Sequence, residues 1–198
     1  MTIGRADPAA FLRLDLRAHE LLRGVPLHDV WTVDLPGGGD RTIADVRALL
    51  RFDRLASLGV AVRALFRLRA WLGRALSWDA LAPSVGAASF LHRLDEADRR
   101  LSLVEPGSAD GPFTVLYVRP REAVSEIRNA TVHAFSVLAL EPCAGGQRLF
   151  WAIYVAPVGR ITAWYMALID PFRRLVIYPA ILRHVRRAWR APREGAAG

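Results

Sequence analysis

The last long apolar run of the chain decides the fold: residues Ile161–Trp189 read ITAWYMALIDPFRRLVIYPAILRHVRRAW. Apolar side chains recur in it at spacings of three, four and seven residues, which place them in one stripe along a helix. The members of this stripe are Ile161, Trp164, Leu168, Phe172, Leu175, Pro179, Leu182 and Trp189. Such a helix is too apolar to stand alone in water. We therefore expect the strand-like segments just before it to cover the stripe.

Two prolines interrupt this predicted helix. Asp170 and Pro171 are typical of a helix start, because an aspartate N-cap is followed by proline at the first helical position. The run is therefore either two helices that meet at Asp170 or one helix kinked at Pro171 and Pro179. The apolar stripe keeps its phase across both prolines, which favours one kinked unit.

The segments before this helix show the two-residue period of strands. Strands are predicted at 28–35, 101–104, 113–118, 123–127, 131–140 and 149–155. Turn residues separate them, so they form an antiparallel meander that leads into the final helix. Strand 131–140 is apolar on both sides, with Val132, Ala134 and Leu138 on one and Phe135 and Val137 on the other. We expect the last helix to cover one face of the sheet, and helix 55–76 or a second subunit the other.

Helices are predicted at 7–23, at 42–50 with Thr42 as its cap, and at 55–76, with a short helical turn at 89–94. The predicted fold class is α+β, a helix-grip arrangement in which a curved antiparallel sheet wraps around a long kinked C-terminal helix, with extra N-terminal and middle helices. We divide the chain into an N-terminal helical extension (1–26), a single helix-grip domain (27–190) and a disordered tail (191–198).

The charge pattern narrows the range of partners. All 27 basic residues are arginine, and the formal net charge is +8. The arginines are scattered, whereas nucleic-acid binders gather basic and aromatic residues on one face, so we expect no nucleic-acid partner. One stripe, Arg183, Arg186, Arg187 and Arg190, lies near the end of the last helix. It is typical of cations placed at a helix C-terminus, and peripheral contact with an anionic membrane surface or with nucleic acid is the alternative interpretation of this stripe alone.

Metal, disulfide and targeting signals are missing from the sequence. Cys143 is the only cysteine, and the five histidines do not show a metal-binding spacing. We expect no metal and no cofactor. The N-terminus lacks the pattern of a signal peptide. The apolar window 161–182 carries Asp170, Arg173 and Arg174, each costing about 2.5–3.5 kcal/mol inside a bilayer. We therefore expect a soluble, cytoplasmic protein.

Two groups of residues are candidates for a site. His133 lies in an apolar strand, so it is either a structural residue with a hydrogen-bonded partner or a general acid–base group inside a cavity. Glu126 and Arg128 flank the same hairpin, as a rim ion pair or as a polar gate. The second group consists of aromatic side chains that belong to the core or form walls of a cavity: Tyr117, Trp151, Tyr154, Trp164 and Tyr165.

Four stretches together resemble a known pattern: His28–Leu35, FRLRAWLG at Phe66–Gly73, EAVSEIRNATVHAFSVLAL at Glu122–Leu140, and GRITAWYMALIDPFRR at Gly159–Arg174. Residues 27–188 resemble an uncharacterised bacterial family of unknown function that is similar to the START/polyketide-cyclase-like (SRPBCC, helix-grip) superfamily. His133 matches a histidine of that family, and Tyr165 matches an aromatic residue after a Gly-Arg pair. Arg173 stands where the family often has the histidine of Pro-Phe-His. The resemblance implies a cavity between the sheet and the long helix.

Three hypotheses for the function follow. The first is a protein that binds a small hydrophobic molecule in that cavity, as a carrier or as a cofactor-independent cyclase- or isomerase-like enzyme with His133 and Tyr165 as acid–base groups. The expected ligand-binding residues are Tyr117, Glu126, Arg128, Trp151, Tyr154, Trp164 and Phe172. The alternatives are a lipid-handling or peripheral membrane protein and an accessory domain whose sheet forms a homodimer.

Overall fold

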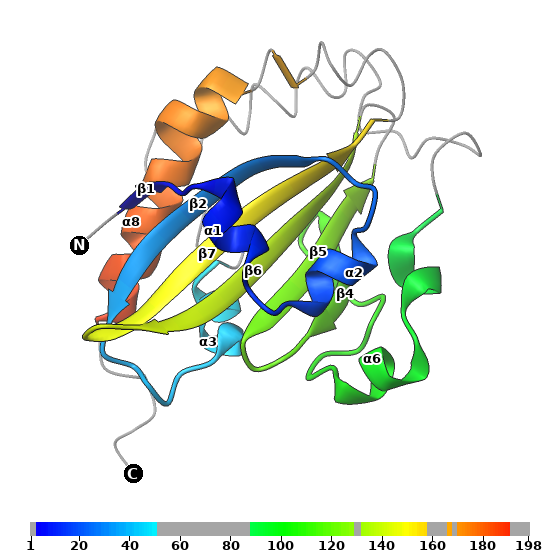
Figure 1. The fold of residues 1–198 in the computed structure, drawn as a ribbon, viewed down its shortest axis with the longest axis horizontal. Coiled ribbons are helices and arrows are strands. Elements are labelled where there is room, and N and C mark those ends of the chain that lie inside the picture. The colour runs from blue at the N-terminus through cyan, green and yellow to red at the C-terminus, as the bar shows by residue number, and fades with distance from the viewer. Residues whose placement is uncertain (1–2, 51–87, 129–131, 158–165, 168–169, 191–198) are drawn as a thin grey trace.

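The computed structural model describes residues 3–50, 88–128, 132–157, 166–167 and 170–190. They form a mixed α+β fold around one seven-stranded antiparallel sheet, in the order β1-β2-β7-β6-β5-β4-β3 (Figure 1). The predicted combination of an antiparallel sheet with a C-terminal helix is confirmed. The predicted helix 55–76 and the tail 191–198 lie outside the described residues.

The strands follow the predicted meander closely. Their bounds are β1 Ile3–Arg5, β2 Leu27–Pro36, β3 Ala109–Asp110, β4 Phe113–Val118, β5 Glu122–Arg128, β6 His133–Cys143 and β7 Gly146–Ala156. The predicted strand 101–104 is wrong. Leu101 ends helix α6 (Glu96–Leu101), which Asp95 begins with a capping box. The short edge strands β1 and β3 were not predicted, because three and two residues carry too little periodic signal.

The predicted helix 7–23 is also wrong, because two short helices replace it: α1 (Pro8–Leu12) and α2 (Arg17–Leu21). Leu16 between them has extended backbone angles. The Glu122 carboxylate accepts hydrogen bonds from the backbone N–H groups of Arg17 (3.1 Å) and Ala18 (3.3 Å). A distant side chain therefore satisfies the start of α2. Helix α3 (Ile43–Leu49), with its Thr42 capping box, and the 3-10 helix η1 (Phe90–Arg93) confirm the predictions there.

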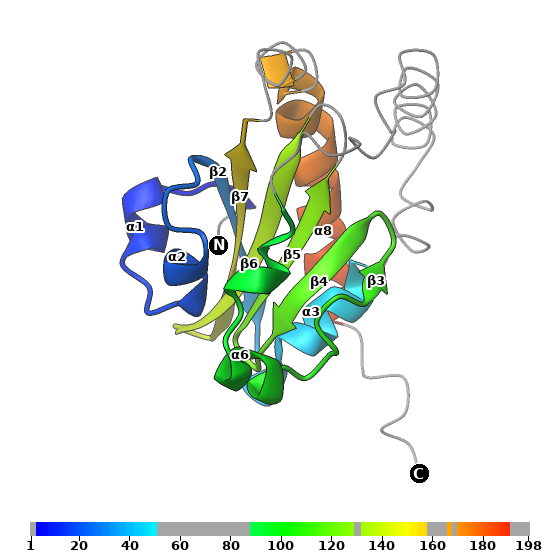
Figure 2. The ribbon, with the colours of Figure 1, turned by 90° about the vertical axis from the view of Figure 1, so that its right-hand side faces the viewer.

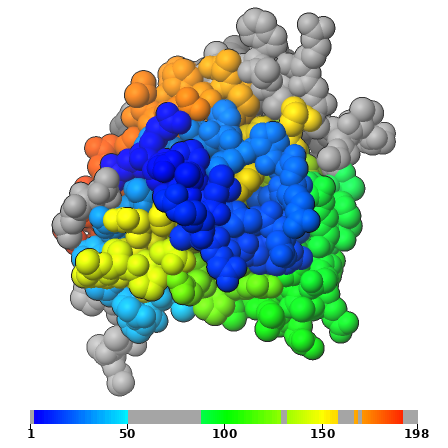
Figure 3. All heavy atoms as spheres, in the orientation of Figure 1, coloured from blue at the N-terminus to red at the C-terminus, as the bar shows by residue number. Residues whose placement is uncertain are grey.

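Helices pack on both faces of the sheet, as the apolar residues on both sides of strand 131–140 predicted. On one face, helix α8 (Tyr178–Trp189) packs against β1, β2 and α3, and its side chains join one apolar cluster with Val33, Leu35 and Leu138. On the other face, α1, α2 and η1 form a second cluster with Phe135 and Val137. Figure 2 shows the two layers on either side of the sheet, and Figure 3 shows the N-terminal segment lying across the second face. The chain's own N-terminal segment thus covers part of the face assigned to helix 55–76 or a second subunit.

The C-terminal helix is continuous from residue 170 to Trp189, but it contains a π-helix, η2 (Arg173–Ile177), between the two prolines. The predicted apolar stripe fails at this point. Phe172 and Leu175 are 47% and 78% exposed, while the buried face of α8 consists of Tyr178, Ile181, Leu182, Val185 and Trp189. A π-helix bonds residue i to i+5 and holds more residues per turn. The stripe predicted from a period of 3.6 therefore rotates out of phase.

The glycine-rich turn after β2 receives the end of this helix. A Cβ atom on Gly38 would lie 2.7 Å from the Trp189 ring, so only glycine leaves room for that indole. Arg41 donates a hydrogen bond to the Trp189 carbonyl oxygen (2.7 Å) and lies over its ring. Among the described residues, no helix is long and apolar enough to span a bilayer.

Candidate functional site

The predicted residues Glu126, Arg128 and His133 come together at one end of strands β5 and β6. Glu126 and His133 are 1% and 2% exposed, and the His133 ring Nε2 lies 2.8 Å from Glu126 Oε2. The same carboxylate accepts hydrogen bonds from the Ser89 hydroxyl and the Phe90 N–H (3.1 Å), and it lies 3.5 Å from Arg128 Nε. The network therefore ties the start of η1 to the sheet.

Burial opposes ionisation of Glu126, but hydrogen bonds from His133, Ser89 and Phe90 outweigh it and hold the pKa of this carboxyl below its usual value. The order of contacts places the carboxylate between the hydroxyl and the imidazole. His133 therefore does not contact Ser89 as a base contacts a nucleophile in a catalytic triad. A buried anchor is the role that this geometry supports.

The other predicted residues are divided between the two faces of the sheet. Tyr117 and Tyr154 lie with His133 on the face covered by α1, α2 and η1. Burial raises the pKa of both phenols, that of Tyr154 to about 12, and the Tyr117 hydroxyl donates to Glu122 (3.1 Å). Trp151 lies on the α8 face, and Phe172 is exposed. Trp164 and Tyr165 lie outside the described residues.

The α8 face carries a patch of partly exposed residues at the centre of the sheet. Its members are Ser125, Ile127, Ala134, Ser136 and Trp151, and we call it the central patch. Ser125 and Ser136 are directly paired across β5 and β6, and the Trp151 indole N–H donates to the Ser136 hydroxyl (2.9 Å). Among the described elements, α8 packs over β1 and β2 at one side of the sheet, and the patch residues on the central strands are only partly buried.

Three aromatic rings border the central patch on the side of α8. Tyr178 lies against Trp31 and Trp151, with ring centroids 5.0 Å apart in both pairs. Trp31 is 6% exposed, and its buried indole N–H has no hydrogen-bond partner among the described residues. Burial raises the pKa of Tyr178 to about 12 although Arg173 opposes this shift, so the phenol is neutral at physiological pH. The border therefore consists of aromatic rings packed against one another.

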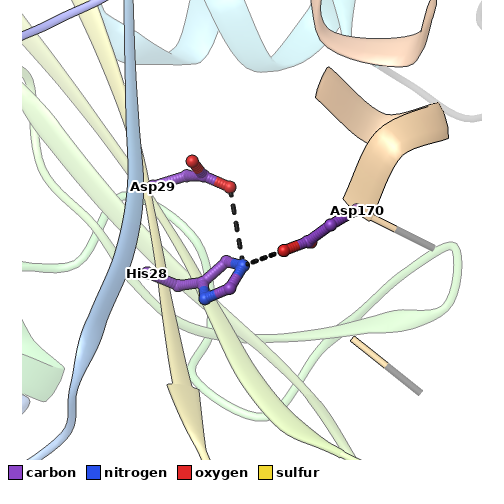
Figure 4. A group of neighbouring side chains, drawn as sticks. All are labelled: His28, Asp29 and Asp170. Carbon is purple, nitrogen blue, oxygen red and sulfur yellow. Dashed lines mark hydrogen bonds and ion pairs between the residues drawn. The ribbon is translucent and has the colours of Figure 1, made fainter. Parts of the chain in front are cut away.

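A charged network joins β2 to residues 170–174 of the C-terminal helix (Figure 4). His28 Nε2 lies 2.8 Å from Asp170 Oδ2 and 3.6 Å from Asp29 Oδ2. Arg174 lies 3.3 Å from Asp29 and 3.2 Å from Asp170. Arg173 bonds to Asp170 (3.0 Å) and also donates to the Tyr178 hydroxyl, so this network extends to the aromatic border.

His28, Asp29 and Asp170 also form a group of three potential metal ligands, whose ligand atoms all lie within 4.8 Å of one another. The Arg174 guanidinium approaches all three, since its Nη2 is 3.5 Å from the His28 ring nitrogen. A divalent metal bound at about 2.0–2.2 Å would have to displace this cation. The positive charges of Arg173 and Arg174 already balance the negative charges of Asp29 and Asp170. The residues therefore fit an ion-pair network better than a metal centre.

This network supports a prediction about stability. Replacing Asp29 by asparagine is expected to lower the free energy of unfolding by about 2 kcal/mol, because its side chain is 0% exposed and neutralising it removes contacts to Arg174 and Arg5. Asp34→Asn on the same strand is the control. Its partner Arg148 is 41% exposed, so we expect a change of about 0.5 kcal/mol. Urea unfolding measures both, and equal losses would contradict an anchoring role for Asp29.

The serine pair, Tyr178 and the His28–Asp170 contact are not predicted by the sequence pattern. The two serines carry a weak signal, since they are small polar residues at alternate positions of apolar strands. His28 and Asp170 are 142 residues apart, and Asp170 had a sufficient explanation as an N-cap. No short-range pattern connects such residues.

Comparison with known proteins identifies a family. A family model described as "Protein of unknown function (DUF2867)" matches residues 21–180. A search of curated proteins finds no match to the chain. The matched range contains the central patch, its aromatic border and both polar networks.

Proposed function

We propose that this chain, which belongs to the DUF2867 family of proteins of unknown function, binds a small and largely apolar molecule on the central patch beside α8. One observation carries the proposal: Ser125, Ser136 and Trp151 are partly exposed although they lie on central strands of the sheet. Central positions of a sheet covered on both faces are ordinarily buried. A ligand that covers the patch would complete this face.

The chemistry of the patch suggests the kind of ligand. Ile127 and Ala134 supply apolar surface, and the Trp151 and Tyr178 rings supply flat walls. Since the Ser136 oxygen already accepts from Trp151, its hydroxyl proton can be donated to a ligand. We therefore propose a neutral ligand with a carbonyl or ether oxygen at one end.

The proposal includes a relationship to the helix-grip superfamily, which the seven-stranded antiparallel sheet and the C-terminal helix support. We propose a binding protein in preference to an enzyme. Glu126 and His133 lie on the opposite face of the sheet from the patch, so they are not placed to act on a ligand held there. The homodimer predicted from the doubly apolar sheet stays a prediction, and the chain's own helices cover part of each face.

The proposal is tested by filling the patch. Ser136→Leu is expected to weaken binding of the neutral fluorescent probe prodan, a naphthalene ketone, by about tenfold or more, because the larger side chain occupies the ligand's place. Fluorescence titration measures the dissociation constant, and circular dichroism checks that the variant folds. Ser136→Ala keeps the space and removes only the hydroxyl, so it should retain most of the probe binding.

The matched control is Thr114→Leu, which enlarges a partly exposed residue of β4. Thr114 is paired with Glu126, so it lies on the face of the sheet opposite the central patch. We expect it to leave probe binding within about twofold of the natural chain. Equal weakening by Thr114→Leu and Ser136→Leu would place the probe elsewhere and refute the proposed site. Failure of the natural chain to bind the probe would refute it as well.

A further inference from the structure

The outer side of the C-terminal helix combines exposed apolar and exposed cationic side chains. Phe172 and Leu175 are 47% and 78% exposed, and Arg183, Arg187 and Arg190 are exposed along the following turns. Arg183, Arg187 and Arg190 recur at intervals of four and three between the buried residues of α8, so this helix has a buried side and an outer side. We call Phe172, Leu175, Arg183, Arg187 and Arg190 the outer face.

The π-helix is what turns the apolar residues outward. The sequence pattern places Phe172 and Leu175 in the same stripe as Leu182 and Trp189, yet the extra residue in the π-helical turn separates them. Leu175 is the most exposed of the large hydrophobic residues that the structure describes. π-helical turns are rare and frequently lie at functional sites. Two large apolar side chains, Phe172 and Leu175, are therefore exposed beside this turn.

The charges of the outer face are of one sign. The segment 171–190 contains six arginines and no aspartate or glutamate. Arg173 and Arg174 are directed to the carboxylates of Asp170 and Asp29. Within the described part of the chain, Arg183, Arg187 and Arg190 form no ion pair with a carboxylate. The Arg183 Nε donates to the carbonyl oxygen of Pro179 (2.9 Å), which holds that side chain along the helix surface.

We propose that the outer face docks on an anionic lipid bilayer. The arginines would contact the headgroups, and Phe172 and Leu175 would enter the boundary between headgroups and acyl chains, as in helices that lie in the membrane interface. Charge complementarity identifies an anionic partner, and the exposed apolar pair favours a bilayer over nucleic acid or an acidic protein, which offer little apolar volume to receive it. The proposal does not depend on the ligand proposed above.

The test is co-sedimentation of the full chain with vesicles of phosphatidylcholine alone and of phosphatidylcholine mixed with phosphatidylserine. We expect binding to the mixed vesicles only, weakened by salt. The variant R183Q/R187Q/R190Q should bind about 100-fold less tightly, since each arginine near an anionic surface contributes about fivefold. The variant F172S/L175S should bind at low salt and dissociate at moderate salt, because it keeps charge attraction and loses insertion.

The matched control is R13Q/R23Q/R100Q, which removes the same charge at exposed positions of the other layer. We expect it to bind within about threefold of the natural chain. Equal losses in both triple variants, or equal binding to neutral and anionic vesicles, would overturn the proposal. A second outcome would also overturn it: the chain binds double-stranded RNA as tightly as the mixed vesicles, and the F172S/L175S variant binds that RNA with the same affinity. The Ser136→Leu variant should bind vesicles as tightly as the natural chain. The proposed ligand site on the central patch and the proposed membrane contact of the outer face can therefore be refuted separately.

Discussion

Replacing Glu126 by alanine is expected to lower the free energy of unfolding by about 3–5 kcal/mol, because the change breaks a buried pair and leaves its partners unsatisfied. Glu126 accepts from the His133 ring, the Ser89 hydroxyl and the Phe90 N–H. The other ring nitrogen of His133 is buried and finds no hydrogen-bond partner in the part of the chain that the structure describes. In the variant the imidazole therefore keeps no hydrogen bond in an apolar surrounding of Phe90 and Phe135.

The same carboxylate predicts how stability depends on pH. The pKa of Glu126 is lower in the folded chain than the 4.5 of an unperturbed glutamate, although burial alone would raise it. Folding therefore favours the ionised form. This contribution is fully present above about pH 4.5 and is lost as the pH falls through the lowered value. The difference in stability between the natural chain and Glu126→Gln should accordingly shrink in acid.

Urea unfolding at neutral and acidic pH measures both effects. Arg128→Gln is the control, because Arg128 lies on the same strand but its side chain is 39% exposed; we expect a loss of about 0.5 kcal/mol or less. The double variant Glu126→Leu/His133→Leu should recover part of the loss, since it replaces the pair by apolar groups. A Glu126→Ala loss no larger than that of Arg128→Gln would show that the pair does not anchor η1.

Gly146→Ala is the second change with a large expected effect, a loss of about 3–5 kcal/mol. Gly146 begins β7, where it pairs with Pro36 of β2 and with Cys143 of β6. A Cβ atom there would lie 2.7 Å from the Gly37 nitrogen and closer still to the Leu35 carbonyl oxygen. Both neighbours are backbone atoms, so the clash is relieved only by separating β2 from β7.

Gly4→Ala provides the control for this prediction. Gly4 also lies in a strand, but an added Cβ would meet no heavy atom within 4 Å. We expect a change within about 0.5 kcal/mol. Thermal and urea unfolding compare the two variants. Similar stability of Gly146→Ala and Gly4→Ala would show that the β2–β7 junction tolerates a side chain.

The Glu126–His133 contact shows how far a local pattern reaches. The two residues are seven positions apart across one hairpin, and the strand pattern alone places them near each other. Which face of the sheet they occupy depends on the covering layers. Residues 7–23 read as one helix, but the Glu122 carboxylate helps begin a second helix at Arg17. Arg17 and Glu122 are 105 residues apart, so the hydrophobic periodicity within residues 7–23 does not reveal their contact.

The sequence by itself determined the alternation of strands, their antiparallel order and a final amphipathic helix, because periods of two and 3.6 residues report on local backbone geometry. It also showed that both faces of strand β6 are apolar. Only the tertiary structure decided which segments cover each face, where the C-terminal helix changes phase, and that His28 meets Asp170 beside Tyr178. These outcomes depend on packing and ion pairs between residues far apart in the chain, whose free energies exist only once the layers are assembled.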